Sequence, residues 1–363
     1  MREQSPERPH YPALDGLRGL AILLVVFYHN FAFTPYFFFG WLGVDLFFVL
    51  SGFLITDILL KTREQPQFLR NFYIRRVLRI FPLYYLVLLI FLVLVPLLAP
   101  ALLNLEYFTN HQLWLWTYLQ NWLYIFQPPP AHSAALNHLW SLAVEEQFYL
   151  LWPLLILWIR KPRLLAWLMV LLLAGVIVLR IYLWVNRVEN LVYYNLYTFS
   201  RIDGICIGSL LALLRCINPR AVHRYLGLVV LALALLNFTF YFFNREHRFS
   251  YPYLAIAGYT TFAVLFGLLV NEGVSGDRFI TGIFNNRLLK FFGKISYSLY
   301  VFHWPLYLML APRLEAWASP TGGIRPHLLA SIACTVLACL VAWISYEFFE
   351  KRFLKMKAKF ELS

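Results

Sequence analysis

Charged side chains are scarce in this sequence. Only 13% of its 363 residues are Asp, Glu, Lys or Arg, whereas 61% are hydrophobic. A soluble domain typically carries about 25% charged residues, which it needs to cover its surface. The scarcity excludes a soluble globular protein, and apolar runs long enough to cross a bilayer recur along the whole chain. We predict an all-α integral membrane protein with a single domain, residues 1–363.

Cysteine is also rare, and its placement argues against sulfur chemistry. The cysteines form no CxxC pair and lie in or beside apolar runs, as reduced packing residues do: Cys206, Cys216, Cys334 and Cys339. The sequence also lacks a ligand spacing typical of a zinc site. We therefore predict no metal and no permanently bound cofactor.

The apolar runs predict a bundle of about ten transmembrane helices with both termini in the cytoplasm. We expect the first run to be a retained helix rather than a signal peptide, because it carries ionisable residues and no cleavage site follows it. The predicted spans are about 12–33, 38–60, 80–100, 138–159, 164–185, 195–214, 224–243, 252–270, 291–310 and 327–348.

The distribution of lysine and arginine sets the predicted orientation. The formal charge of +13 could suggest a nucleic-acid partner, but the basic residues lie mostly in short connections between apolar runs. Cytoplasmic termini place most of these connections inside the cell, and the long outer stretch from Pro96 to Asn137 then has no lysine or arginine. We predict an inner (plasma) membrane protein in contact with lipid and with no nucleic-acid partner.

Arg18 and His29 are the first candidates for a functional site. Their spacing of eleven residues puts them on one face of the first span, roughly 16 Å apart along the axis. A histidine inside a membrane is costly unless it has a role. Asp45, at a similar depth in the second span, is expected to orient its ring, as in a base–orienter pair. The alternative is an edge arginine and a histidine capped by a neighbouring hydroxyl.

The fourth span adds a carboxylate pair. His138, Ser141 and Glu145 share one stripe of a helix, whereas Glu146 points about 100° away. Adjacent carboxylates in hydrocarbon require pairing, protonation or water, and Glu145 is the functional candidate. His138 lies near the outer interface, and a structural role there is an equal alternative to a functional one.

Two later spans carry further polar residues. Arg201 and Asp203 do not face each other on a helix, so each needs a partner elsewhere, and Arg201 could reach Asp45 or Glu145. An ion pair that only fixes helix packing is an equal alternative. Tyr300 and His303 share a face of the ninth span, where acceptor binding or support competes with an interfacial polar role.

Three arginines form a basic cytoplasmic loop before the third span. Arg75, Arg76 and Arg79 are spaced as helix-face neighbours, which suits a polyphosphate ligand. Taken alone, they could serve only to enforce topology. Together with Arg18 on the same side, they favour phosphate binding.

The order and spacing of several motifs resemble the acyltransferase-3 family of membrane acyltransferases, in a form without a fused extracytoplasmic hydrolase-like domain. The motifs are LDGLRGLAILLVVFYH, GVDLFFVLSGFLI, RRVLRIFPLYY, WSLAVEEQFYLLWP, FSRIDGICIGSLLA, GKISYSLYVFHWP and SYEFFEKRF. One departure is that Glu350 is followed by Lys351 and Arg352, where the family often has a Glu-x-Pro turn. That departure puts a role for Glu350 in doubt.

The resemblance implies transfer of an acyl group, usually acetyl from cytoplasmic acetyl-CoA, to hydroxyls of cell-surface glycans, lipid-linked sugars or similar acceptors. It implies that Arg18 and His29 are essential and that Arg76, Arg79 and Glu145 contribute. Without a hydrolase-like domain, the chain is expected to finish the transfer itself or to use a separate periplasmic or export partner.

The predicted mechanism has acyl-CoA docked at the cytoplasmic arginines. His29 then acts either as general base or as transient acyl carrier, and Asp45 or Glu145 holds its tautomer. The alternative is a transporter or flippase for a glycolipid or polysaccharide precursor, in which the buried charges line a substrate or proton pathway.

Overall fold

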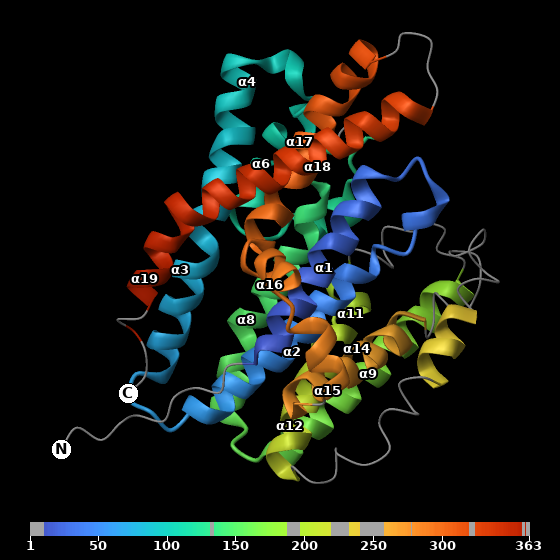
Figure 1. Cartoon of the computed structure of the whole chain (residues 1–363). Helices are drawn as coiled ribbons and strands as arrows, with labels where there is room; N and C mark the ends of the chain where they lie inside the picture. The colour runs from blue at the N-terminus through green and yellow to red at the C-terminus, as the bar shows by residue number, and fades with distance from the viewer. Residues whose placement is uncertain are drawn as a thin grey trace.

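The computed structural model describes residues 11–130, 134–186, 197–218, 232–239, 258–276, 278–318, 324–357 and 360. All regular structure in these ranges is helical, which confirms the all-α class. Long helices lie side by side in a bundle, with shorter ones at the end where α4 lies (Figure 1). The long helices are α1 (Pro12–Asn30), α2 (Leu42–Thr62), α3 (Phe68–Leu89), α8 (Trp140–Trp158), α9 (Pro162–Val185), α12 (Asp203–Ile217), α14 (Tyr259–Ser275), α17 (Ser296–Ala318) and α18 (Ile324–Ser345).

Shorter helices connect or cap the long ones. They are α4 (Val95–Leu98), α5 (Glu106–Asn110), α6 (Gln112–Trp116), α7 (Gln120–Phe126), α11 (Thr198–Arg201), α15 (Arg278–Phe284), α16 (Arg287–Lys294) and α19 (Lys351–Lys357). The 3₁₀ turn η4 (Asn137–Leu139) leads directly into α8.

Five helical segments among the described residues are long and apolar enough to cross a membrane. They are Pro12–Asn30, Pro35–Thr62, Phe68–Leu98, Pro162–Val185 and Ile324–Lys357. Five of the predicted spans fall on these segments. Predicted spans 138–159, 195–214, 252–270 and 291–310 fall largely on helices that are shorter or more polar, and span 224–243 lies mostly outside the described residues. A count of ten therefore stays a prediction.

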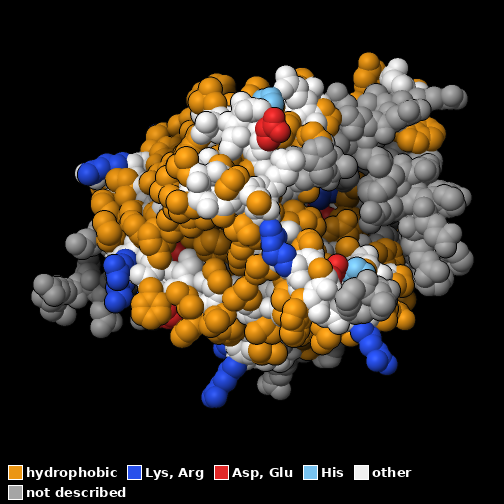
Figure 2. Space-filling model, turned by 90° about the horizontal axis from the view of Figure 1, so that it is seen from above, with side chains coloured by type: hydrophobic (Ala, Val, Ile, Leu, Met, Phe, Trp, Pro, Cys, Tyr) orange, Lys and Arg blue, Asp and Glu red, His pale blue; other side chains and the backbone are white. Residues whose placement is uncertain are grey.

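The outward-facing side chains agree with a lipid environment. Large apolar residues are more than half exposed along α9 and α18, where a soluble protein would carry charge: Leu171, Val178, Tyr182, Leu329 and Val336. Seen from the end of the bundle where α4 lies, the described surface is mainly hydrophobic, with scattered charged side chains (Figure 2). Membrane character is thus supported by the surface as well as by the helices.

The predicted loop before the third span is helical. We expected a loop before residue 80, but α3 begins at Phe68, so Arg75, Arg76 and Arg79 lie on the helix itself. Apolarity alone misplaced the boundary because arginine is a good helix former whose aliphatic stem packs along apolar surface. Their predicted helix-face spacing is therefore realised.

Close contact between α2 and α12 forms the centre of the bundle. A Cβ added to Gly52 would lie 2.1 Å from the carbonyl oxygen of Ile205, and one added to Gly208 would lie 2.1 Å from that of Val49. Small residues allow helix backbones to approach this closely in membranes. The contact brings Asp45 of α2 beside Arg201 at the end of α11.

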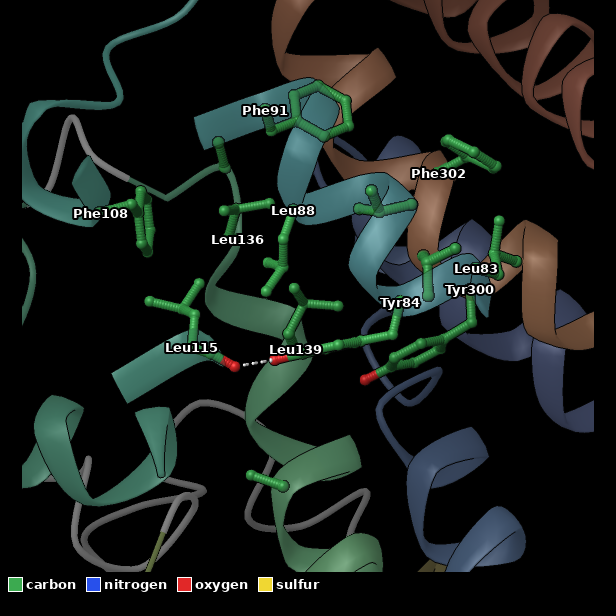
Figure 3. Packing of buried hydrophobic residues seen from close by; sticks show 14 of the residues in the cluster. Leu83, Tyr84, Leu88, Phe91, Phe108, Leu115, Leu136, Leu139, Tyr300 and Phe302 are labelled. Atoms are coloured by element: carbon green, nitrogen blue, oxygen red, sulfur yellow. Dashed lines mark hydrogen bonds between the residues drawn. The ribbon is translucent and has the colours of Figure 1, made fainter. Parts of the chain in front are cut away.

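A hydrophobic cluster joins α3 and α17 to the short helices α5–α7. Its buried members include Leu88, Phe108 and Leu139, and Tyr300 lies at its edge (Figure 3). The hydroxyl of Tyr84 donates a hydrogen bond of 2.8 Å to the carbonyl of Leu115, which ties α6 to α3. The cluster thereby gives the α17 residues around Tyr300 a fixed backing.

The packing predicts that Gly208→Ala is destabilising. The added methyl group clashes with backbone atoms of α2, and overpacking of this kind costs about 1–3 kcal/mol. We expect a lower temperature of thermal unfolding in detergent. Gly175→Ala in α9 is the matched control, because nothing lies within 4 Å of its added Cβ. Equal unfolding temperatures for the two variants would contradict the close α2–α12 packing.

Candidate active site

Two histidines from distant parts of the chain meet at the centre of the candidate site. Nδ1 of His29, at the end of α1, lies 3.0 Å from Nε2 of His303 in α17. Nδ1 of His303 lies 3.0 Å from the carbonyl oxygen of Leu299 and 2.7 Å from that of Tyr300. His303 is fully buried, whereas His29 is partly exposed.

These contacts assign the tautomers of a neutral pair. A carbonyl oxygen only accepts, so Nδ1 of His303 carries its proton and Nε2 has the lone pair. Nδ1 of His29 must then donate to that lone pair. Nε2 of His29 is consequently unprotonated, which is the form that acts as a base or a nucleophile.

The partner of His29 differs from the expected one. We expected Asp45 or Glu145 to orient its ring, but His303 occupies that position. Asp45 accepts a hydrogen bond of 2.7 Å from Arg201 in a buried ion pair. The predicted reach of Arg201 to Asp45 is therefore confirmed.

Arg201 and Asp203 both belong to a buried charge network. The guanidinium of Arg201 lies 4.2 Å from the ring centroid of Tyr259, a cation–π contact. Asp203 pairs at 2.9 Å with Arg180, which also donates to the carbonyl of Ser200. These contacts give both predicted residues the structural role that we weighed as an alternative.

Two further rings adjoin the histidine pair. Trp304 packs on His29 with ring centroids 4.8 Å apart. The ring of His138 lies 5.3 Å from that of His303, and His138 is only 4% exposed. Neither nitrogen of His138 has a hydrogen-bond partner in the structure.

An open cavity lies beside this cluster. Tyr300 and Ser141 lie in its wall, as do Arg18, Arg76 and Arg79. Oγ of Ser141 lies 2.5 Å from the hydroxyl of Tyr300, which in turn donates to the carbonyl of His138 at 2.5 Å. Tyr300 therefore lines the cavity and also packs beside His138 and His303.

The basic wall of the cavity has unused hydrogen-bonding capacity. Nε of Arg18 and Nε of Arg76 are buried without a partner. Arg75 is 7% exposed but does not line the cavity. Lys357 at the end of α19 lies within electrostatic range of all four arginines, and sequence reasoning missed it. Nothing in its basic tail distinguishes it from Lys355, so only the fold could identify it.

Glu145 is the carboxylate of this cavity. It accepts hydrogen bonds of 3.0 Å from Ser51 and from Tyr149. Glu146 points elsewhere, as its helix position predicted, into a second cavity beside α3 that also contains Arg76. The two carboxylates therefore face different spaces.

Glu350 is held inside the protein, although the residues that follow it depart from the family pattern. It is 8% exposed and accepts a hydrogen bond from Ser298 in α17. This contact joins the helical turn Tyr346–Glu350, directly before α19, to the helix that carries His303.

Comparison with known proteins places these features in a family. The chain is 30% identical over 94% of its length to a peptidoglycan O-acetyltransferase of Listeria monocytogenes, OatA. It is 30% identical over 97% of its length to a Bacillus subtilis protein, YrhL, to which the same activity is provisionally assigned. A Staphylococcus aureus protein provisionally assigned as an O-acetyltransferase is 32% identical over 81% of the chain.

The chain spans about half the length of these relatives: 56%, 56% and 50%, respectively. No solved structure gives a significant match. The sequence model of the acyltransferase-3 family, described as an acyltransferase domain, matches residues 11–347, nearly the whole chain. The chain therefore belongs to the acyltransferase-3 family.

Proposed function

We propose that this chain is a membrane O-acyltransferase. It takes an acyl group, most simply acetyl, from cytoplasmic acyl-CoA and transfers it to a hydroxyl group of an acceptor, with His29 as the catalytic residue. One observation carries the proposal. A cavity with an arginine-rich wall is also lined by Tyr300, and the ring of Tyr300 packs beside His303, the partner of His29.

The positive charge of the cavity wall supports acyl-CoA as the donor. Acyl-CoA carries several phosphate charges at one end, and arginine binds phosphate through paired hydrogen bonds. The buried Nε atoms of Arg18 and Arg76 lack partners, which is costly unless a ligand supplies them. Lys357 adds a fifth cation to the four arginines of this region. The positive-inside rule puts this end in the cytoplasm.

The distance between Arg18 and His29 along α1 fits the length of such a donor. Arg18 and His29 are eleven residues apart on one helix, so they are separated by roughly 16 Å, a length that an extended pantetheine arm can span. The thioester then reaches the level of His29. Nε2 serves there either as base for the acceptor hydroxyl or as carrier of the acyl group.

The relatives support a cell-surface glycan as the acceptor. The Listeria monocytogenes relative is named for O-acetylation of peptidoglycan. His29 is partly exposed in the last turn of α1, where a cell-surface or lipid-linked glycan could approach. We therefore assign the acceptor to hydroxylated cell-surface glycans of that kind.

The first test is release of CoA from acetyl-CoA by the purified protein. We expect His29→Ala to lower the rate about 1,000-fold, because the lost imidazole is either the base or the carrier. His111→Ala is the control, since His111 bonds Tyr107 and Gln127 away from the cavity. Normal turnover in a folded His29→Ala variant would refute the role of His29. No release by the wild type would favour the transporter alternative.

The second test concerns the arginine wall. We expect Arg76→Ala to raise KM for acetyl-CoA about 10- to 100-fold, the range for a lost charge-assisted hydrogen bond. Arg76→Lys should leave KM for acetyl-CoA almost as high, because lysine cannot form the paired hydrogen bonds that arginine makes to phosphate. Arg70→Ala is the matched control, since Arg70 lies on the same helix but is exposed and bonds Gln67. Equal KM values for the Arg70 and Arg76 variants would reject the phosphate assignment.

The third test concerns His303 as a positioning residue. His303→Ala removes the acceptor for Nδ1–H of His29, and we expect kcat to fall about 100-fold with little change in KM for acetyl-CoA. His303→Gln retains a side-chain acceptor oxygen and should recover part of the loss. If glutamine and alanine reduce kcat equally, hydrogen bonding by residue 303 does not orient His29.

A further inference from the structure

His138 is a buried imidazole that nothing in the proposed reaction has yet used. It lies in η4, directly before α8, with its ring 5.4 Å from that of Tyr300 and 5.3 Å from that of His303. The backbone of Tyr300 and of Val301 lies near the ring, but neither contact has the geometry of a hydrogen bond. Both ring nitrogens are therefore buried and unpaired.

An unpaired buried imidazole is costly and calls for a physical reason. The neighbouring polar groups are already occupied. His303 is bonded through both nitrogens, and the hydroxyl of Tyr300 accepts from Ser141 while donating to the backbone of residue 138. Among the described residues of this cluster, Nε2 of His29 and the lone pair of His138 remain available.

The geometry of the histidine pair shows why a second base is needed. If Nε2 of His29 accepts the acyl group, its lone pair is used in the new C–N bond. Nδ1 of His29 faces His303, so it cannot approach an acceptor hydroxyl. His29 therefore cannot carry the acyl group and deprotonate the acceptor in the same step.

Resting on the proposed function, we propose that His138 is the base for the acceptor hydroxyl in a two-step transfer through acyl-His29. In the first step, Nε2 of His29 bonds the acyl carbon, the C–S bond breaks and CoA leaves as the thiolate. The proton on Nδ1 of His29 passes to Nε2 of His303. This step leaves a neutral acyl-imidazole beside a protonated His303.

In the second step, the hydroxyl oxygen of the acceptor bonds the acyl carbon and its proton moves to His138. The C–N bond to His29 breaks, and His29 regains its Nδ1 proton from His303. His138 then loses its proton, which balances the thiolate released with CoA. Both imidazoles of the pair return to their neutral starting tautomers.

The test separates the two steps with nucleophiles that differ in their need for a base. Water and glycerol require deprotonation, whereas hydroxylamine attacks an acyl-imidazole as the neutral amine. With acetyl-CoA, His138→Gln should release a first equivalent of CoA in a burst, as the wild type does. Steady-state release into water and glycerol should then be about 100-fold slower. Added hydroxylamine should restore turnover to the wild-type rate.

Controls distinguish this proposal from the proposed function itself. His29→Ala should lose both the burst and the hydroxylamine-dependent turnover, and His111→Gln should lose neither. His138→Asn is a second variant if the glutamine variant is not recovered folded. Loss of the burst in His138 variants would give the residue a structural role and overturn the proposal, as would unchanged steady-state release. A wild type that releases no CoA would overturn the proposed function and this step with it.

Discussion

Polar atoms inside this bundle must find partners within the protein, because hydrocarbon supplies none. Most of the central ones do. Asp45 pairs with Arg201, and Arg180 binds the Ser200 carbonyl, Asp203 and Thr260 together. The exceptions in the described part of the chain include Nε of Arg18 and of Arg76, and also single atoms of Asp45 and Asp203 and two nitrogens of Arg201. Arg18 and Arg76 differ from the others because they line an open cavity, where a ligand can complete their hydrogen bonds.

The buried charge network holds the helices in register around the site. Asp45 belongs to α2, Arg201 to α11 and Arg180 to α9, so each ion pair links separate helices. Breaking a buried pair by removing one partner leaves an uncompensated charge, at a cost of about 3–5 kcal/mol. The network is weak evidence for net stability, but it fixes which helices are neighbours. Loss of activity after substitution of Asp45 would therefore need a test of folding before it could count as chemistry.

The chemical type of a site residue was easier to predict from the sequence than its partner. The all-α class follows from composition, and the Arg18–His29 spacing follows from helix geometry within one element. The contact between His29 and His303 joins residues 274 positions apart, and such a pairing is set by tertiary packing alone. Boundaries were also poorly predicted where arginines lie inside a helix, as in α3.

The choice of His303 over a carboxylate has a physical reason. A carboxylate that oriented His29 would place an unbalanced negative charge in a medium of low dielectric constant, unless a cation neutralised it. The structure pairs Asp45 with Arg201 instead and leaves His29 to a second neutral ring. A base–orienter pattern taken from soluble enzymes therefore favoured the wrong partner within a membrane.

Tyr300 lies in the wall of the cavity and also beside the histidine cluster. Its hydroxyl is bonded to Ser141 and to the backbone of residue 138, and its ring packs beside those of His138 and His303. In the proposed reaction, the thioester of the donor must pass Tyr300 to reach His29. The two hydrogen bonds of the Tyr300 hydroxyl must then break while the donor is bound. Each typical bond contributes only about 0.5–1.5 kcal/mol net, which ligand binding can offset. In the proposed reaction, these two bonds would hold Tyr300 in place before the donor binds and would yield when it is bound.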